Sequence, residues 1–150
     1  MTTNNTPLLT IDNLDVQFRL DRETVHAVRG VSFTLNKGET LALVGESGSG
    51  KSVTAMSIVR LHPDNMTEYG ADSKIAFEGV SMLDAPPETL RQLRGNRIGM
   101  IFQGFNLLES RSVAGNVAFP LELAGWDAAR IAGRVDELLE LAGLGGKRDA

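Results

Sequence analysis

A glycine-rich segment at residues 45–52 constrains this chain more than any other feature of its sequence. It lies between an apolar run, residues 41–44, and a segment whose apolar residues recur at helical spacing. The residues of this segment match the pattern G-x-x-x-x-G-K-[ST] at every fixed position. Its members are Gly45, Glu46, Ser47, Gly48, Ser49, Gly50, Lys51 and Ser52. A glycine-rich surface turn is the simpler explanation, but the strand–loop–helix setting favours a phosphate-binding loop.

Each residue type in this segment suits the binding of a triphosphate. Glycines let the backbone turn tightly, so that successive N–H groups point inward at an anion. The helix expected to start near Lys51 adds the positive end of its dipole. The ammonium of Lys51 can reach the outer phosphates, and the hydroxyl of Ser52 can ligate a Mg²⁺ that bridges them. The segment therefore predicts a site for a nucleoside triphosphate.

The apolar residues around this loop predict an α/β fold. Alternating residues indicate strands, and the continuously apolar run 41–44 indicates a strand buried on both faces of a sheet. Residues 97–102, which contain four large apolar residues, are a further candidate for a buried strand. The predicted strands are 9–18 with a kink at Asp12 and Asn13, 25–28, 31–35, 41–44, 74–78 and 97–102. The predicted helices are 52–61, Pro86 to about 93, a segment capped by Ser112 running towards 123 with a kink or break at Pro120, and a segment capped by Asp127 and closed by Gly143.

Composition and charge exclude several classes of protein. The 150-residue chain has a net charge of −4 and no run of Lys or Arg, which argues against a nucleic-acid partner. The short cluster of Arg91, Arg94 and Arg97 is interpreted as solvated surface. Without cysteine there is no disulfide or thiolate metal site. Residues 1–7 are polar, are expected to be flexible and lack the layout of a signal peptide. No apolar run approaches the roughly 18 residues that cross a bilayer, so work at a membrane would be that of a peripheral subunit.

About 44 residues with strand-like patterning precede the phosphate loop, whereas small kinases and GTPases usually open their fold with it. In this the chain resembles the ATP-binding subunits of ABC transporters, whose P-loop domain carries an antiparallel β-subdomain before the loop. The resemblance covers nearly the whole chain. It implies an α/β P-loop NTPase of the ABC ATPase type, with ATP and Mg²⁺ as its ligands and residues 8–150 as its nucleotide-binding domain.

Two further positions carry the resemblance. Phe18 stands 33 residues before Lys51, where the family has an aromatic residue that stacks on adenine, and Gln103 stands 52 residues after it, in the place of the family's Q-loop glutamine. From the residues alone, Phe18 is the last core residue of a strand and Gln103 a polar residue at a strand end. The resemblance implies instead that Phe18 binds the base, that Gln103 and Ser52 contact Mg²⁺, and that Gln103 and Lys51 act in catalysis.

The importer signal within the family is divided. Residues 45–61 look like the dipeptide and oligopeptide importers, and residues 98–144, with their Phe102–Leu108 stretch, look like the methionine importers. The resemblance implies an ATP-binding component that drives uptake of peptides or amino acids. Its partners would be transmembrane permease subunits and a second ATPase subunit, at the cytoplasmic face of the plasma (inner) membrane.

Several motifs of the family are missing from the sequence. There is no L-S-G-G-Q signature, no apolar strand ending in Asp and Glu, and both His26 and His62 precede Gln103, so neither fits the switch histidine. Residues 80–84 are interpreted as a surface hairpin. We therefore expect an incomplete domain, truncated in its helical subdomain, that is not hydrolytically competent alone although the complete protein is an ATPase. The alternatives are an ATP-binding regulatory module, a non-hydrolysing truncated ABC protein, and a soluble ABC ATPase of repair or translation, against which the importer-like segments argue.

Overall fold

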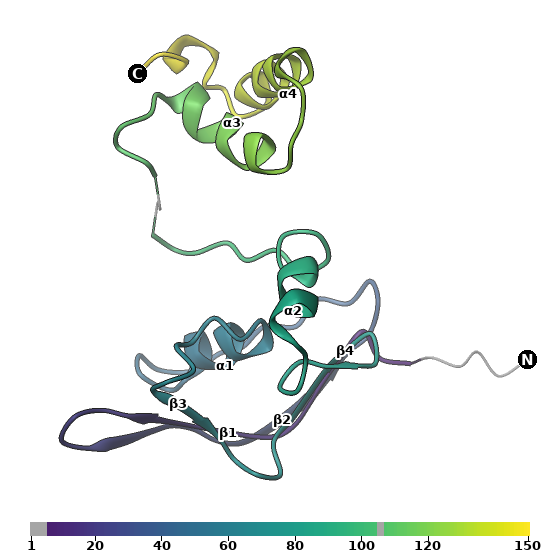
Figure 1. Cartoon of the computed structure of the whole chain (residues 1–150), viewed down its shortest axis with the longest axis vertical. Coiled ribbons are helices and arrows are strands. Elements are labelled where there is room, and N and C mark those ends of the chain that lie inside the picture. Colours follow the sequence, from purple (N-terminus) through teal and green to yellow (C-terminus); the bar gives the residue numbers. More distant parts are fainter. Residues whose placement is uncertain (1–5, 105–106) are drawn as a thin grey trace, which may run out of the picture. The chain divides into compact units, whose positions relative to one another are not determined.

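The computed structural model describes residues 6–104 and 107–150. Residues 1–5 of the predicted flexible N-terminus, and Phe105 and Asn106 of the methionine-importer-like stretch, lie outside the described residues. The chain divides into two compact units, Met1–Met100 and Ile101–Ala150, and each is described by itself (Figure 1).

An antiparallel sheet of five strands forms the base of the first unit (Figure 1). β1 pairs with β2 on one side and with β3 and β4 on the other, and β5 pairs with β4. The strands are β1 (Leu9–Arg19), β2 (Thr24–Leu35), β3 (Thr67–Tyr69), β4 (Lys74–Phe77) and β5 (Val80–Ser81). The predicted antiparallel subdomain before the loop is confirmed, with 25–28 and 31–35 joined in one strand, and the predicted hairpin at 80–84 forms on β4.

The predicted kink in the first strand is a bulge. The register of β1 against β2 shifts between Ile11 and Leu14, and Asn13 takes a φ of 48° there. Asparagine tolerates this left-handed conformation better than most residues. The backbone N–H of Asn13 leaves the ladder and donates to Ser32 Oγ at 2.8 Å. The shift keeps Leu14 and Val16 on the core face, where both are fully buried.

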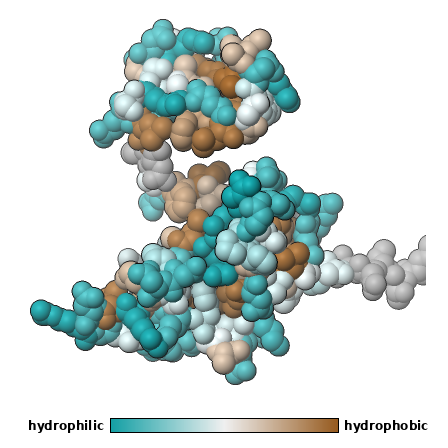
Figure 2. Space-filling view, viewed as in Figure 1, coloured by the Kyte–Doolittle hydropathy of each residue, from teal (hydrophilic) through white to brown (hydrophobic). Residues whose placement is uncertain are grey.

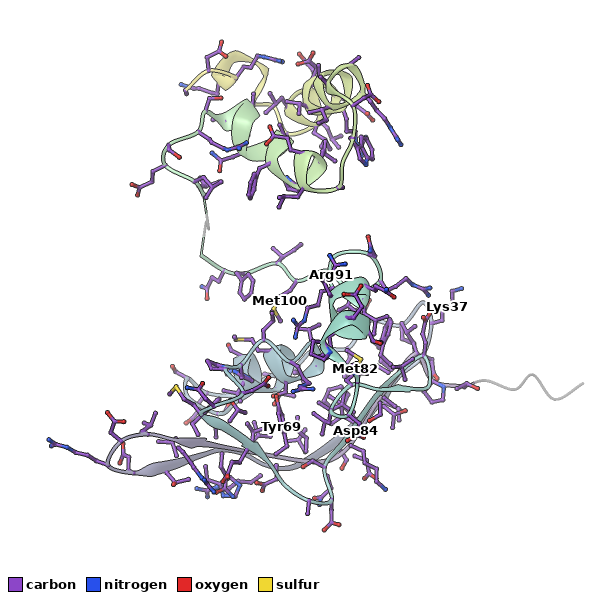
Figure 3. All side chains as sticks on the ribbon, viewed as in Figure 1. Lys37, Tyr69, Met82, Asp84, Arg91 and Met100 are labelled. Atoms are coloured by element: carbon purple, nitrogen blue, oxygen red, sulfur yellow. The ribbon has the colours of Figure 1, made fainter. Side chains whose placement is uncertain are left out.

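The core of the first unit lies between the sheet and two short helices, α1 (Lys51–Ile58) and α2 (Pro87–Leu93). Fully buried Met82 packs in this core (Figure 3). The helix predicted at 52–61 ends early because Arg60, with a φ of 47°, reverses the backbone. The N–H of Leu61 then donates to the carbonyl of Met56 at 3.0 Å, which closes the last turn in the manner of a Schellman motif.

The second unit is helical and begins its helices as predicted. Ser112 Oγ accepts from Gly115 N at the start of α3 (Val113–Leu123), and Asp127 accepts from Arg130 N at the start of α4 (Ala128–Leu141). Gly143, with a φ of 67°, ends α4, and a short 3-10 helix, η1 (Gly145–Lys147), follows. Pro120 lies inside α3, which continues past it. Two apolar residues of α4, Val135 and Leu139, are buried. None of the helices in the described ranges is long and apolar enough to cross a bilayer.

Two predicted strands are wrong. Residues 41–44 and 97–102 have no strand structure, although Ile98 forms an isolated bridge with Arg94. Val44 is 91% exposed and Ile101 is fully exposed, and such apolar residues contribute to the hydrophobic surface seen in Figure 2. An apolar run becomes a buried strand only when neighbouring strands accept and donate its backbone hydrogen bonds. No such neighbour pairs with either run within the described part of the chain.

Candidate functional site

The predicted phosphate loop lies between the end of β2 and helix α1, which begins at Lys51. Within it, the backbone N–H of Ser49 donates to the carbonyl of Glu46 at 3.2 Å, which forms a tight turn. Gly48 has a φ of 81° and Gly50, the N-cap of α1, a φ of 86°. Both values lie in the left-handed region, where a side chain is costly. Gly48 and Gly50 therefore stand where the backbone requires glycine.

Gly50 also packs closely against strand β2. A Cβ atom at this position would lie 2.5 Å from the carbonyl oxygen of Ala27 and 3.3 Å from a methyl group of Val28. Since the first of these atoms belongs to a strand backbone, it cannot move aside cheaply. The absence of a side chain at Gly50 thus lets the start of α1 rest directly on the sheet.

The N-terminal end of α1 is left open by the protein's own side chains. The first bond within the helix runs from Thr54 N to Gly50 O at 2.8 Å, so the preceding N–H groups have no partner inside the helix. Among the described residues, no side chain caps this end, and the first turn holds no acidic residue. Unsatisfied N–H groups and the helix dipole make such an end suitable for an anion.

The ammonium of Lys51 is held over this loop by neutral groups. It donates to the carbonyl oxygens of Gly45 at 2.8 Å and Glu46 at 2.6 Å, and to Ser49 Oγ at 3.1 Å. No carboxylate of the described residues forms an ion pair with it. Its positive charge is therefore positioned but not neutralised, as the binding of a polyphosphate requires. Ser52, the next residue of α1, is exposed at the same end, so its hydroxyl fits the ligand role predicted for Mg²⁺.

Phe18 lies near the end of β1, half-buried and in contact with the core cluster of the first unit. Its ring meets the ring of His62 edge-on, with centroids 5.1 Å apart and an angle of 72° between the planes. Phe18 is thus part of the packing of this unit, as its place at the end of a strand predicts. Its stacking on a base remains a prediction.

Gln103 lies in the second unit, in an exposed bend. Its predicted contacts with Mg²⁺ and with an attacking water remain predictions. Residues 45–52, by contrast, all lie in the first unit and follow one another along the chain.

Three features near the loop helix are not foreseen from the sequence. Arg94, interpreted as solvated surface, is instead half-buried and donates from Nε to the carbonyl of Val59 at 2.8 Å and from its guanidinium to that of Arg60. It therefore binds the C-terminal end of α1, where a cation is favoured. His62 Nε2 lies 3.0 Å from the carbonyl of Val53. The third is Tyr69, whose hydroxyl is buried without a hydrogen-bond partner among the described residues. Spacing along the chain carries no signal for these contacts, because their partners lie on other turns or elements.

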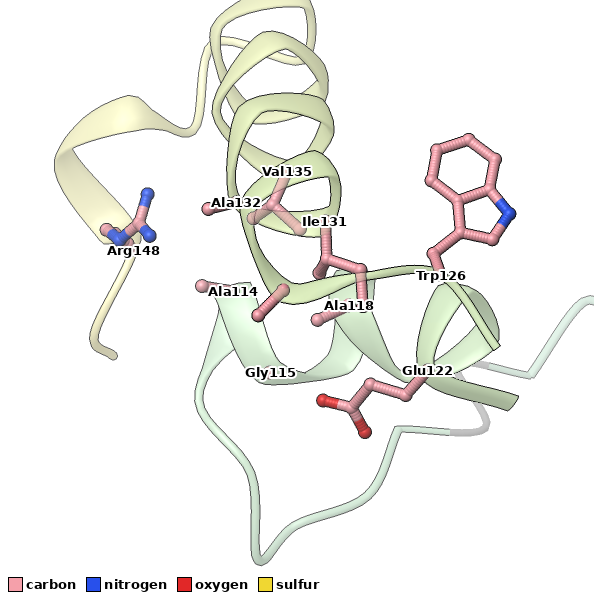
Figure 4. A pocket seen from close by; sticks show the side chains of 10 residues that line it. Ala114, Gly115, Ala118, Glu122, Trp126, Ile131, Ala132, Val135 and Arg148 are labelled. Atoms are coloured by element: carbon pink, nitrogen blue, oxygen red, sulfur yellow. The ribbon is translucent and has the colours of Figure 1, made fainter. Parts of the chain in front are cut away.

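One hollow of the second unit lies beside helices α3 and α4 (Figure 4). It has a volume of about 480 Å³. Small and apolar residues form much of its wall, including Ala114, Gly115, Ala118, Ile131 and Val135. The charge of Arg148 at its edge is paired with Asp136.

Comparisons with known proteins agree with this fold. A family model described as ABC transporter matches residues 28–150. The methionine import ATP-binding protein MetN 3 of Oceanobacillus iheyensis is 40% identical over 140 residues, which are 93% of this chain and 39% of that protein. MetN of Helicobacter pylori strain J99 is 44% identical over 119 residues, 79% of this chain and 34% of that protein. A solved dimer of MJ0796, a bacterial ABC transporter cassette, superposes with a TM-score of 0.78 at 23% identity, covering 94% of this chain and 60% of its own.

The fold is that of an ABC ATPase cassette, and the predicted fold class is confirmed. The chain belongs to the ABC transporter family. It spans less than half the length of these two methionine-import relatives.

Proposed function

We propose that residues 45–52 bind the triphosphate of ATP and that the chain is the nucleotide-binding part of an ABC importer. The observation that carries the proposal is the open end of α1, with the unneutralised ammonium of Lys51 held over it. A triphosphate would accept hydrogen bonds from the N–H groups of Gly50, Lys51 and Ser52 and would draw the ammonium away from its neutral loop partners. The exchange favours binding because the ammonium then faces an anion instead of uncharged carbonyl and hydroxyl oxygens.

Mg²⁺, when bound, would neutralise charge between the outer phosphates, and the Ser52 hydroxyl and Gln103 amide oxygen are the groups of this chain that would hold it. The Gln103 amide both donates and accepts, so it can also orient a water without changing its own charge. Phe18 would offer the face of its ring to the base. Glycines 45, 48 and 50 contribute by letting the backbone reach the phosphates.

Hydrolysis is proposed for the complete protein, where residues 8–150 would form the nucleotide-binding domain as far as its helical subdomain. Positioning and charge stabilisation supply most of the catalysis of phosphoryl transfer. Two such subunits would work with a membrane permease, as peripheral proteins on the cytoplasmic face. The methionine-import relatives support an amino acid such as methionine as the transported substrate, with a peptide as the alternative suggested by residues 45–61.

The test of the proposal is Lys51→Ala, with binding of Mg-ATP measured by calorimetry or equilibrium dialysis. We expect the substitution to abolish measurable binding, because it removes the only mobile positive charge of the loop. Lys37→Ala is the matched control, since Lys37 is an exposed lysine in the turn after β2 (Figure 3). Affinity should be unchanged there. An unchanged affinity in Lys51→Ala would refute the assignment of the loop.

A further inference from the structure

We propose that His62 is a positioning residue for the base: it holds the ring of Phe18 in place by tying it to the phosphate-loop helix. This inference rests on the proposed function and extends it to a residue outside the loop. The sequence alone gives His62 only the role of ending a helix, before Pro63.

His62 is anchored on α1 by a hydrogen bond. Its Nε2 lies 3.0 Å from the carbonyl oxygen of Val53, the residue that follows Ser52. A carbonyl can only accept, so Nε2 carries the hydrogen of this bond. The bond fixes the orientation of the imidazole relative to the first turn of α1, the same turn whose N–H groups face the phosphate loop. Pro63 adds a second constraint, because a residue before proline is biased away from the helical conformation.

The same imidazole meets the ring of Phe18 edge-on. The centroids lie 5.1 Å apart and the ring planes are inclined by 72°, which is the favourable geometry of an aromatic pair. The backbone of Phe18 is already held in the sheet, opposite Val25 on β2 and Thr67 on β3. The contact with His62 adds a constraint on the rotation of its ring, which is only half-buried.

These two contacts connect the parts of the site that bind opposite ends of one ligand. The phosphates would lie at the start of α1 and the base on Phe18, which belongs to a different element, β1. His62 spans the two, so the ring for the base and the donors for the phosphates keep a constant separation. A preorganised pair of this kind lowers the cost of ordering the ring when the nucleotide binds.

The experiment measures affinity for two probes, ATP and inorganic tripolyphosphate, on the whole chain and on His62→Ala, Phe18→Ala and the double variant. We expect His62→Ala to bind ATP about threefold to tenfold more weakly, as the loss of an aromatic pair predicts, with tripolyphosphate affinity unchanged. The double variant should bind ATP within about twofold of Phe18→Ala alone, because His62 acts through Phe18. His26→Ala is the matched control, since the His26 ring is bonded to Asp15, and should bind both probes normally.

His62→Gln is a second variant that tests the same proposal if His62→Ala fails to fold. Glutamine keeps an N–H donor for the Val53 carbonyl but lacks the ring, so we expect the same selective loss of ATP affinity. Normal ATP affinity in His62→Gln, an equal loss for both probes, or additive losses in the double variant would each overturn the role of His62. Those results would leave the phosphate loop intact, whereas unchanged binding in Lys51→Ala would remove the proposed function itself.

Discussion

Helices α1 and α4 begin in opposite ways. α4 starts at Asp127, whose carboxylate accepts from the backbone N–H of Arg130 at 2.9 Å and so satisfies one donor of the first turn. α1 starts at Gly50, which has no side chain and holds a left-handed backbone conformation. Capping by an acidic residue stabilises a helix by satisfying its N–H groups and its dipole. At α1 the protein forgoes that stabilisation.

An uncapped N-terminus points to a binding role, rather than to a poorly formed helix, when the C-terminus of the same helix is well capped. The other end of α1 is reversed at Arg60 and is bound by the guanidinium of Arg94. α1 is therefore not a loosely ended helix, and its open start is a local feature of the phosphate loop. Four substitutions can break or sharpen the contrast between the two helices.

The largest effect is expected from Gly50→Ala. The new Cβ would combine a φ of 86° with an approach of 2.5 Å to the Ala27 carbonyl, so we expect a loss of about 2–5 kcal/mol in unfolding free energy and the loss of Mg-ATP binding. Denaturant unfolding and calorimetry measure the two effects. Gly48→Ala is the control, because Gly48 has a similar φ of 81° but open space around it, and its cost should be about 1–2 kcal/mol. Equal costs for both would show that contact with β2 is unimportant.

Phe18→Ala tests whether the ligand that binds at the N-terminal end of α1 also presents a base to Phe18. We expect ATP to bind more weakly by about 1–3 kcal/mol, the usual value for the loss of one base–aromatic stack. Affinity for tripolyphosphate should not change, since the phosphate loop is untouched. A fall in unfolding free energy with normal ATP affinity would show that Phe18 is a core residue only.

Asp127→Ala tests the capped end. We expect the second unit to lose about 1 kcal/mol of stability, the typical cost of removing a side-chain cap. Mg-ATP affinity should stay normal, in contrast with Gly50→Ala. Asp127→Asn, which retains a good cap, should lose little, and far-ultraviolet circular dichroism during urea unfolding would separate the variants. A loss of nucleotide affinity in Asp127→Ala would break the contrast between the helices.

The smallest effect concerns Tyr69, which pairs with Val16 beneath the first unit's helices (Figure 3). Burial raises the pKa of its hydroxyl above the ordinary value of 10.0, an effect that Ser57 and Arg60 partly oppose. Since the folded state holds this proton more tightly than the unfolded state, the contribution to stability is complete below pH 10 and is lost as the pH rises through the folded pKa.

Tyr69→Phe isolates this contribution, because it cannot ionise. At neutral pH we expect a change below about 1 kcal/mol, since the hydroxyl lies near Ser57 but makes no well-formed hydrogen bond within the described part of the chain. Above pH 10 the wild-type chain should lose more stability than the variant, as measured by urea unfolding at both pH values. Tyr69 is the chain's single tyrosine, so its absorbance on ionisation can be followed directly. Parallel pH profiles would contradict the raised pKa.

The parts of the fold that sequence predicts well depend on neighbours along the chain. The caps at Ser112 and Asp127 and the terminating Gly143 appear where expected, because each acts within one turn of its own helix. The pairings of β1 with β2 and of β4 with β5 also depend on short connections, whereas β3 and β4 reach β1 from a distant part of the chain. The phosphate loop is recognisable for the same reason, since its donors come from contiguous residues.

Residues 41–44 and 97–102 show where such prediction ends. Their apolar runs have the composition of buried strands, yet Val44 and Ile101 are exposed. Hydrophobicity indicates that such a run is able to be buried, but hydrogen-bonding neighbours decide whether it becomes a strand.

By itself, the sequence determined the glycine-rich loop before α1, the helix caps and the β1–β2 hairpin, because local spacing and backbone preference are enough to specify them. Only the tertiary structure decided that Gly50 rests on the Ala27 carbonyl, that Arg94 binds the end of α1, and that His62 joins Phe18 to Val53. These contacts bring together residues from different turns and elements, and their energies depend on packing and distance, which no pattern along the chain records.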